Sequence, residues 1–136
     1  MYQKELAIKD EHIDFQGILD GLYYPYYMEE TRHAFIHDVL GVDIQEDARQ
    51  GTNWVLAEYT LKFKASLTRG DKVTVTCSLS SLEGSRSKFG FRQEMIRDGK
   101  VVAEASFVAT CLPVSGGRPF IHPSVVKGLG ELDASA

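Results

Sequence analysis

Alternation of apolar and polar residues runs through the second half of the chain, and it constrains the fold more than any other feature of the sequence. A period of two is the spacing of side chains on one face of a β-strand. Four segments show it, and their apolar positions are Val55, Ala57, Tyr59, Leu61 and Phe63; Val73, Val75, Cys77 and Leu79; Phe89, Phe91 and Met95, with Gln93 between them; and Val101, Ala103, Ala105, Phe107, Ala109 and Cys111. Asp98-Gly99 is a strong hairpin signal between the last two. The sequence therefore predicts four consecutive strands that meander.

A single helical segment precedes these strands. Residues 2–9 alternate and predict a first strand, whereas apolar residues recur at intervals of three and four over residues 21–40. Asp20 is predicted to cap this helix, and Gly41 to end it. Pro25 lies slightly too deep for a helix that starts at Asp20, so we expect an irregular first turn. Gln45 to Asn53 is expected to be a polar connection.

The predicted element order is β-α-β-β-β-β, which belongs to the α+β class. One long helix must bury its apolar stripe against the sheet, so it is expected to be a central helix packed on a five-stranded antiparallel sheet. The pattern alone also permits a cystatin-like arrangement. All 136 residues are expected to form one domain, in which a short helix begins near Pro123 and residues 127–136 form a poorly ordered tail.

Charge and composition exclude several classes of protein. The net charge is −4, so binding to nucleic acid would need a local basic patch acting against the overall field. No apolar run is long enough to span a bilayer, and the N-terminus lacks the apolar region of a signal peptide, so a cytoplasmic protein with no membrane partner is expected. Cys77 and Cys111 share the apolar side of their strands, which predicts buried free thiols. No further ligands lie at metal-binding spacing, so no metal site is expected.

One carboxylate stands just ahead of the predicted helix start. Asp14 begins the segment Asp-x-x-Gly that ends at Gly17. A helix start presents unpaired N–H groups and the positive end of the helix dipole, which suit a carbonyl oxygen that is gaining negative charge. Asp14 could act on the carbonyl carbon, so these residues form a minimal site for cleaving an activated ester. The alternative is that Asp14 is a turn residue that binds local amides.

The spacing of the residues after Asp14 resembles that of the acyl-CoA thioesterases of the hotdog fold, in particular the 4-hydroxybenzoyl-CoA thioesterase type. The residues in register are Asp14, Gly17, Tyr24, Tyr27, Glu29 and Arg32. The resemblance covers roughly residues 2–125. Many relatives carry His-Val-Asn-Asn after the glycine, where this chain has Ile18-Leu19-Asp20-Gly21.

The resemblance implies an acyl-CoA thioesterase in which Asp14 is the nucleophile or the general base. It assigns the backbone amides of Gly21 and Leu22 to the oxyanion hole, and it assigns Gly17, Tyr24 and Tyr27 to substrate binding. No cofactor is implied, because coenzyme A is part of the substrate. It also implies a homodimer or homotetramer with sites between subunits.

Arg86, Lys88 and Arg92 share a strand parity opposite to that of Phe89 and Phe91. A solvated outer face explains this pattern as well as a binding site does. The functional interpretation is a basic patch for the phosphates of coenzyme A. In the resemblance, Arg86 falls in the segment that contacts phosphate.

Other residues and functions compete with this interpretation. Glu29 and Glu30 are rival acids, because some hotdog thioesterases carry the acid on the central helix. Hotdog relatives also include hydratases and dehydratases, which need a histidine near the acid; His12 is the candidate. A third possibility is a non-catalytic module that binds acyl-CoA. Gly-x-Ser-x-Gly, a glycine-rich phosphate loop and a metal-spaced histidine cluster are all missing from the sequence.

Overall fold

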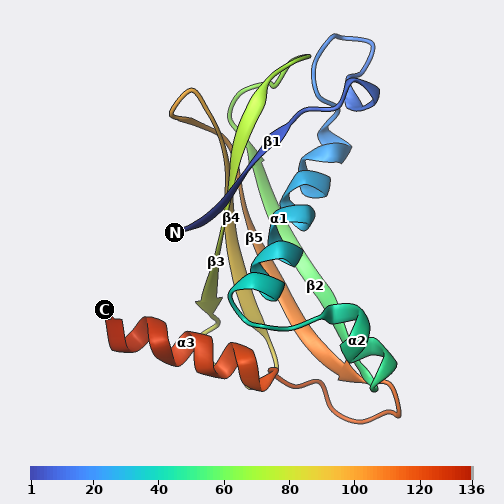
Figure 1. The fold of residues 1–136 in the computed structure, drawn as a ribbon, viewed down its shortest axis with the longest axis vertical. Coiled ribbons are helices and arrows are strands. Elements are labelled where there is room, and N and C mark those ends of the chain that lie inside the picture. The colour runs from blue at the N-terminus through green and yellow to red at the C-terminus, as the bar shows by residue number, and fades with distance from the viewer. Residues whose placement is uncertain (136) are drawn as a thin grey trace.

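The computed structural model describes residues 1–135, and within them the chain forms one five-stranded antiparallel sheet with a long helix across one face (Figure 1). The strands are β1 (Tyr2–Ala7), β2 (Thr52–Phe63), β3 (Lys72–Ser81), β4 (Phe89–Arg97) and β5 (Lys100–Pro113). Their order in the sheet is β1-β3-β4-β5-β2, so β1 and β2 are the two edges. The helix is α1 (Tyr24–Asp38). The predicted α+β class and the order β-α-β-β-β-β are confirmed.

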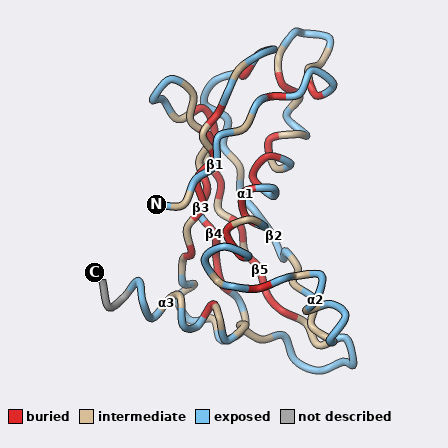
Figure 2. Tube along the Cα trace, viewed as in Figure 1, coloured by how far each residue is buried: buried red, intermediate tan, exposed pale blue. Residues whose placement is uncertain are grey.

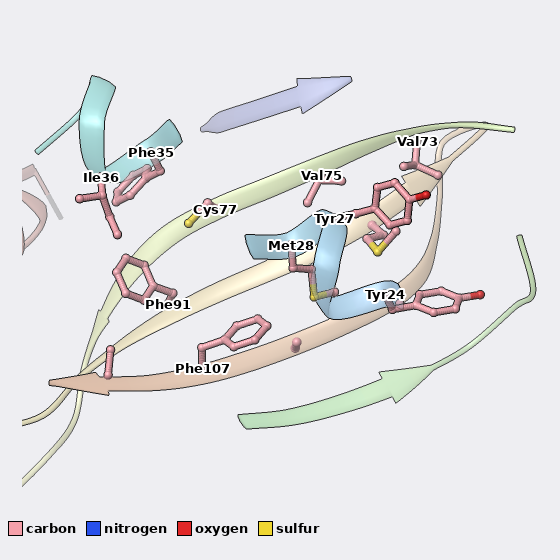
Figure 3. Packing of buried hydrophobic residues seen from close by; sticks show 14 of the residues in the cluster. Tyr24, Tyr27, Met28, Phe35, Ile36, Val73, Val75, Cys77, Phe91 and Phe107 are labelled. Carbon is pink, nitrogen blue, oxygen red and sulfur yellow. The ribbon is translucent and has the colours of Figure 1, made fainter. Parts of the chain in front are cut away.

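The core lies between α1 and the central strands (Figure 2). Tyr24, Tyr27 and Met28 come from one face of α1, and each is at most 3% exposed. Tyr27 and Met28 lie near Val75 of β3 and Phe107 of β5, as Figure 3 shows, whereas the Tyr24 ring packs edge-on against Phe63 of β2. Burying one side chain of this size contributes roughly 1.5–3 kcal/mol, so the apolar stripe fixes the helix to this face of the sheet.

The start of α1 is irregular, as predicted. A single 3₁₀ turn, η2 (Gly21–Tyr23), precedes the α-helix, and Pro25 follows within its first turn. Asp20 caps η2, because its carboxylate accepts a hydrogen bond from the backbone N–H of Leu22 at 2.9 Å. The helix ends at Asp38, and Gly41 follows in the left-handed region with φ of 70°.

The connection between α1 and β2 contains a helix that the sequence interpretation missed. α2 spans Ile44–Arg49 and so occupies much of the predicted polar connection from Gln45 to Asn53, for which no helix was predicted. The Asp43 carboxylate accepts a hydrogen bond from the N–H of Glu46 at 3.1 Å, which is an N-cap. α2 is then tied to β2, because the indole N–H of Trp54 donates to Asp47 at 2.9 Å.

The register of β2 shifts at a bulge between Leu56 and Glu58. Past the bulge, Tyr59 and Phe63 are on the helix side, as predicted. Before it, the strand face is the reverse of the prediction: Leu56 lies opposite Ala109 of the inner face, so the assignment of Val55 and Ala57 to that face was wrong. A bulge adds one residue and so exchanges the two faces of a strand.

The last element is α3 (Pro123–Ser135), which lies across one end of the sheet (Figure 1). Val125 is fully buried, and a Cβ built at Gly128 would approach the Leu79 side chain to 2.8 Å, so the helix packs closely on β3. α3 is therefore longer than the predicted short helix, and it includes most of the segment predicted to be poorly ordered; Ala136 lies outside the described residues. No helix within residues 1–135 has the length and apolar character needed to cross a bilayer.

Candidate active site

Asp14 lies at the tip of a short hairpin that leads into the helix start. Its N–H donates to the carbonyl of Ile18 at 2.9 Å, and its carbonyl accepts from the N–H of Gly17 at 3.0 Å. One carboxylate oxygen, Oδ1, accepts from the N–H of Gln16 at 2.8 Å, so the side chain is held in a local turn. Gly17 is exposed and adopts a φ of 83°, so the turn itself requires a glycine at this position. Gly17 lines none of the cavities described below.

The two amides predicted for the oxyanion hole differ in their partners. The Leu22 N–H already donates to Asp20. The Gly21 N–H has no acceptor among the described residues, as expected at the first position of a helical turn. Gly21 lines a cavity of about 370 Å³ together with Tyr24 and Phe63. The free donor of this helix start is therefore at Gly21, a residue that lines this cavity.

The two predicted substrate tyrosines lie in different environments. Tyr24 borders the cavity at Gly21, its ring packs edge-on against Phe63, and its hydroxyl accepts from the N–H of Leu67 at 3.3 Å. Burial raises the pKa of Tyr24, so the hydroxyl is neutral at ordinary pH. Tyr27 is 1% exposed and lines none of these cavities, so the structure gives it a place in the core instead of at the substrate.

His12 belongs to an aromatic cluster beside the helix start. Its ring stacks on Tyr23 with centroids 3.9 Å apart, and its Nδ1 lies 2.6 Å from the hydroxyl of Tyr27. The Tyr27 hydroxyl also accepts from the N–H of Lys9 at 3.0 Å. The contacts of the His12 ring are therefore with tyrosines and not with Asp14, the acid that it was predicted to assist.

A groove runs along α1 on the side of the edge strand β2. It consists of two adjoining cavities of about 330 and 400 Å³, which share Glu29, Arg32 and Leu56. The first cavity begins at Leu22, so the groove starts where the predicted oxyanion hole is. Its remaining walls are mostly aromatic and aliphatic, and they include Tyr23, Tyr26, Tyr59 and Phe107 in the first cavity and Ile36, Ile44, Trp54 and Phe91 in the second.

The acids on α1 are exposed. Glu29 lines the groove and lies 3.7 Å from His33 Nε2, and both side chains are more than half exposed. Partial removal of the imidazole from water lowers the pKa of His33. Arg32, by contrast, is buried and lines the groove, and the sequence interpretation did not place it in the candidate site. Its position three or four residues from Met28 and Phe35 on the apolar stripe was a signal that it faces inward.

Arg86 and Lys88 are in the connection before β4 and not in a strand, which corrects the predicted strand position. Both are exposed, and the N–H of Lys88 donates to Ser85 Oγ at 3.0 Å. The neighbouring Ser87 carbonyl accepts from Thr110, near the end of the sheet where α3 lies. Gly21 is at the other end of α1, whose 15 residues span about 22 Å. Within one protomer, the basic pair Arg86 and Lys88 is therefore far from the helix start at Gly21.

A separate cavity of about 480 Å³ lies between α1, β3 and α3. Its lining includes Phe35, Leu79 and Lys127 and none of the predicted site residues. Cys77 borders it, and burial raises the pKa of Cys77 and of Cys111 to about 12. Both thiols are buried and unpaired, as predicted, and neither is ionised at ordinary pH.

Known proteins resemble this chain in both sequence and fold. Residues 8–128 match the family described as the thioesterase-like superfamily. Two chloroplastic acyl-acyl carrier protein thioesterases of Arabidopsis thaliana, ATL3 and ATL2, are 28% and 30% identical over 126 residues. These matches cover 93% of this chain but only 65% and 66% of the relatives, so the chain spans about two thirds of their length. The structure of a gentisyl-coenzyme A thioesterase superposes with a TM-score of 0.80 at 25% identity, covering 92% of this chain and 98% of that one.

Proposed function

Because this chain belongs to the thioesterase-like superfamily, we propose that it hydrolyses an acyl thioester of coenzyme A to the free acid and CoA. One observation carries the proposal. The unpaired N–H of Gly21 stands at a helix start, Gly21 lines a cavity, and Asp14 lies on the hairpin immediately before it. A thioester needs an oxyanion site and one base or nucleophile, and these two residues supply them.

The reaction follows from these two groups. The Gly21 amide, at the positive end of the helix dipole, holds the carbonyl oxygen as it gains negative charge. Asp14 either attacks the carbonyl carbon or removes a proton from the attacking water. The C–S bond then breaks, CoA leaves as a thiolate that takes up a proton, and water supplies the second oxygen of the acid. In the nucleophilic route, water hydrolyses a mixed anhydride at Asp14.

The proposed working unit is a homodimer or larger homo-oligomer. β2 is an edge strand of 12 residues with Leu56, Tyr59 and Phe63 partly exposed on its helix side. Such an edge favours pairing with a second chain. Antiparallel pairing of two β2 strands reverses one copy against the other, so the end of one protomer that carries Arg86 and Lys88 approaches the helix start of its partner. This arrangement supports phosphate binding by a basic pair that is distant from Gly21 within one chain.

The test is the release of free thiol from a panel of acyl-CoA substrates, with the same acyl groups also presented on acyl carrier protein. We expect thiol release from the CoA series, and a loss of at least about 100-fold in turnover for Asp14→Asn. The asparagine keeps an oxygen that can accept from Gln16, so the turn and the fold should persist, and a urea unfolding curve checks this. Asp10→Asn, an exposed acid on the preceding turn, is the control that should keep full activity.

The outcomes separate the rival functions. Binding of acyl-CoA without thiol release indicates a binding module, and loss of an enoyl substrate without thiol release indicates a hydratase. Thiol release only from substrates on acyl carrier protein would show that the carrier protein, and not CoA, carries the acyl group in the substrate. Activity of Asp14→Asn within a few-fold of the unchanged protein would transfer the catalytic role to Glu29 or Glu30.

A single turnover in H₂¹⁸O distinguishes the two roles of Asp14. With enzyme in excess, attack of water on the Asp14 carbon of a mixed anhydride leaves one ¹⁸O atom in the Asp14 carboxylate and releases an unlabelled acid, so a labelled Asp14 peptide identifies the nucleophilic route. Label in the released acid alone means that water attacks an acyl carbon, as a general base requires.

A further inference from the structure

Arg32 is a buried cation that has no carboxylate at ion-pair distance, although the charge of Glu29 in the same groove acts on it. The residue is 4% exposed, and no carboxylate lies within 4.0 Å of its guanidinium among the side chains of residues 1–132. Its Nη1 donates to Oε1 of Gln93 at 3.1 Å, and its guanidinium carbon lies 4.4 Å from the centre of the Phe107 ring. Glu29, the acid one turn away, is instead within ion-pair distance of His33.

Burial of an unpaired charge is costly, so this arrangement needs an explanation. Removal from water lowers the pKa of Arg32, but a guanidinium stays protonated in proteins and carries five N–H donors. One neutral amide oxygen and one ring face satisfy only part of that capacity. Buried arginines are normally paired with an anion.

Gln93 holds the guanidinium in a fixed direction. Its Nε2 donates to the carbonyl of Met28 at 2.8 Å and to the carbonyl of Thr76 at 3.2 Å, so both donors of the amide are used. Its Oε1 must therefore point at Arg32. Gln93 is 1% exposed, so this network links α1, β3 and β4 within the core and leaves little freedom to the arginine.

Arg32 also borders the groove. Arg32 lines both of the adjoining cavities, and the first cavity extends from it to Leu22 beside the proposed oxyanion site. The Cα atoms of these two residues are about 15 Å apart along the helix, and helical side chains lean towards the N-terminus, which brings the guanidinium closer to the site. Gly21 itself lines the separate cavity beside Tyr24 and Phe63, and the next residue, Leu22, lines the groove. An acyl group that passes from Gly21 over Leu22 would therefore enter the groove that leads to Arg32.

We propose that Arg32 is a specificity residue that binds a carboxylate at the far end of the acyl group, so that the preferred substrates are thioesters of dicarboxylic acids. This inference rests on the proposed function. A carboxylate pairs with a guanidinium through two parallel hydrogen bonds and supplies the missing anion. A site built around such a polar group discriminates strongly against substrates that lack it, because its own charge is then left unpaired.

The experiment compares matched acyl-CoA pairs of about six to twelve carbons, one member ending in a methyl group and the other in a carboxylate. We expect kcat/KM to favour the carboxylate by about 10- to 100-fold at the best length. Arg32→Met should abolish this ratio, and Arg32→Lys should keep part of it. Arg92→Met is the matched control, because Arg92 is exposed on the other face of β4, and it should keep the ratio.

Several results would overturn the inference. One is a preference of the unchanged protein for methyl-ended chains at every length, which needs no variant and so does not depend on folding. Another is a folded Arg32→Met protein with the original ratio. A third is loss of oligomer in Arg32→Met with the ratio intact, which would show that a second copy supplies the anion.

Failure of the proposed function gives a different result. If no substrate in the panel is hydrolysed, the thioesterase proposal fails, and calorimetric titration of the same pairs still tests Arg32. Tighter binding of the carboxylate member by the unchanged protein, and its loss in Arg32→Met, would support the binding role; equal affinities would refute it.

Discussion

The carboxylate of Asp20 accepts a hydrogen bond from the backbone N–H of Leu22 at 2.9 Å. This contact uses one of the two amides that the sequence assigned to an oxyanion hole. It leaves the Gly21 N–H as the free donor at the helix start, and it holds the 3₁₀ turn that orients this donor. The catalytic proposal therefore gives Asp20 a positioning role and gives Gly21 the contact with the substrate oxygen.

Asp20→Ala should destabilise the fold by about 1 kcal/mol, because the cap of the helix start is lost. Asp20→Asn keeps an oxygen acceptor and should lose much less. Urea unfolding of the two variants measures the difference. Equal stabilities for alanine and asparagine would show that the hydrogen bond to Leu22 does not contribute.

The Arg86→Ala/Lys88→Ala variant should raise KM for acyl-CoA and leave kcat largely unchanged, because exposed phosphate contacts act on ground-state binding. The increase should be largest at low salt, since ions screen exposed charges. Steady-state kinetics at two salt concentrations measure it. Lys4→Ala, on the opposite edge strand, is the control; a KM that does not change in the double variant contradicts the assignment.

Leu56→Lys should dissociate the proposed oligomer, because it places a charge on the exposed apolar side of the edge strand β2. Light scattering should report a multiple of 15.2 kDa for the unchanged protein and a smaller mass for the variant. Val126→Lys, a similarly exposed apolar position on α3, should leave the mass unchanged. An active 15.2 kDa monomer before any substitution would refute the assembly.

If each active site is formed by two subunits, two inactive variants should complement each other. When Asp14→Asn is mixed with a variant disabled at the basic pair, subunit exchange should restore part of the activity, since each hybrid contains one intact site. Self-contained sites would show no recovery.

Asp71→Asn should destabilise the protein by roughly 1 kcal/mol at neutral pH. The Asp71 carboxylate accepts from the N–H of Thr68 at 2.7 Å and from Arg97 at 3.0 Å, and these hydrogen bonds lower its pKa below the ordinary value of 3.8. A lowered pKa means that the stabilisation is complete above pH 3.8 and is lost as the pH falls through the folded-state value. Urea midpoints from pH 7 downwards should therefore converge for the two proteins only below pH 3.8; a constant difference would contradict the role of the charge.

Local signals predicted most of the elements of this fold. The period of two in the strands, the 3.6-residue spacing of α1 and the Asp98-Gly99 turn each depend on a few neighbouring residues. Asp98 and Gly99 have φ of 51° and 75°, as that turn requires. The Asp20 cap and the irregular first turn of α1 were also predictable, because capping is decided within four residues.

Part of the candidate site could also be predicted from neighbouring residues in the sequence. Asp14, Gly17 and the helix start are fixed relative to one another by a hairpin of a few residues, so their proximity follows from their spacing in the sequence. Their catalytic role is a prediction that depends on the proposed assays.

Tertiary structure decided the rest, because it depends on residues that are distant in the sequence. The bulge at Ala57 results from pairing with β5, and it exchanged the faces of half a strand. The order of the strands placed the Arg86 and Lys88 connection at the end of the sheet away from Gly21. Arg32 is spaced like any residue on the apolar stripe of α1, and only the packing of β4 and β5 against that helix gives it Gln93 and Phe107 as neighbours. The same packing makes Arg32 part of the groove wall. The sequence thus determined which segments are strands and helices, since those preferences are local, whereas long-range packing decided which side chains share the groove.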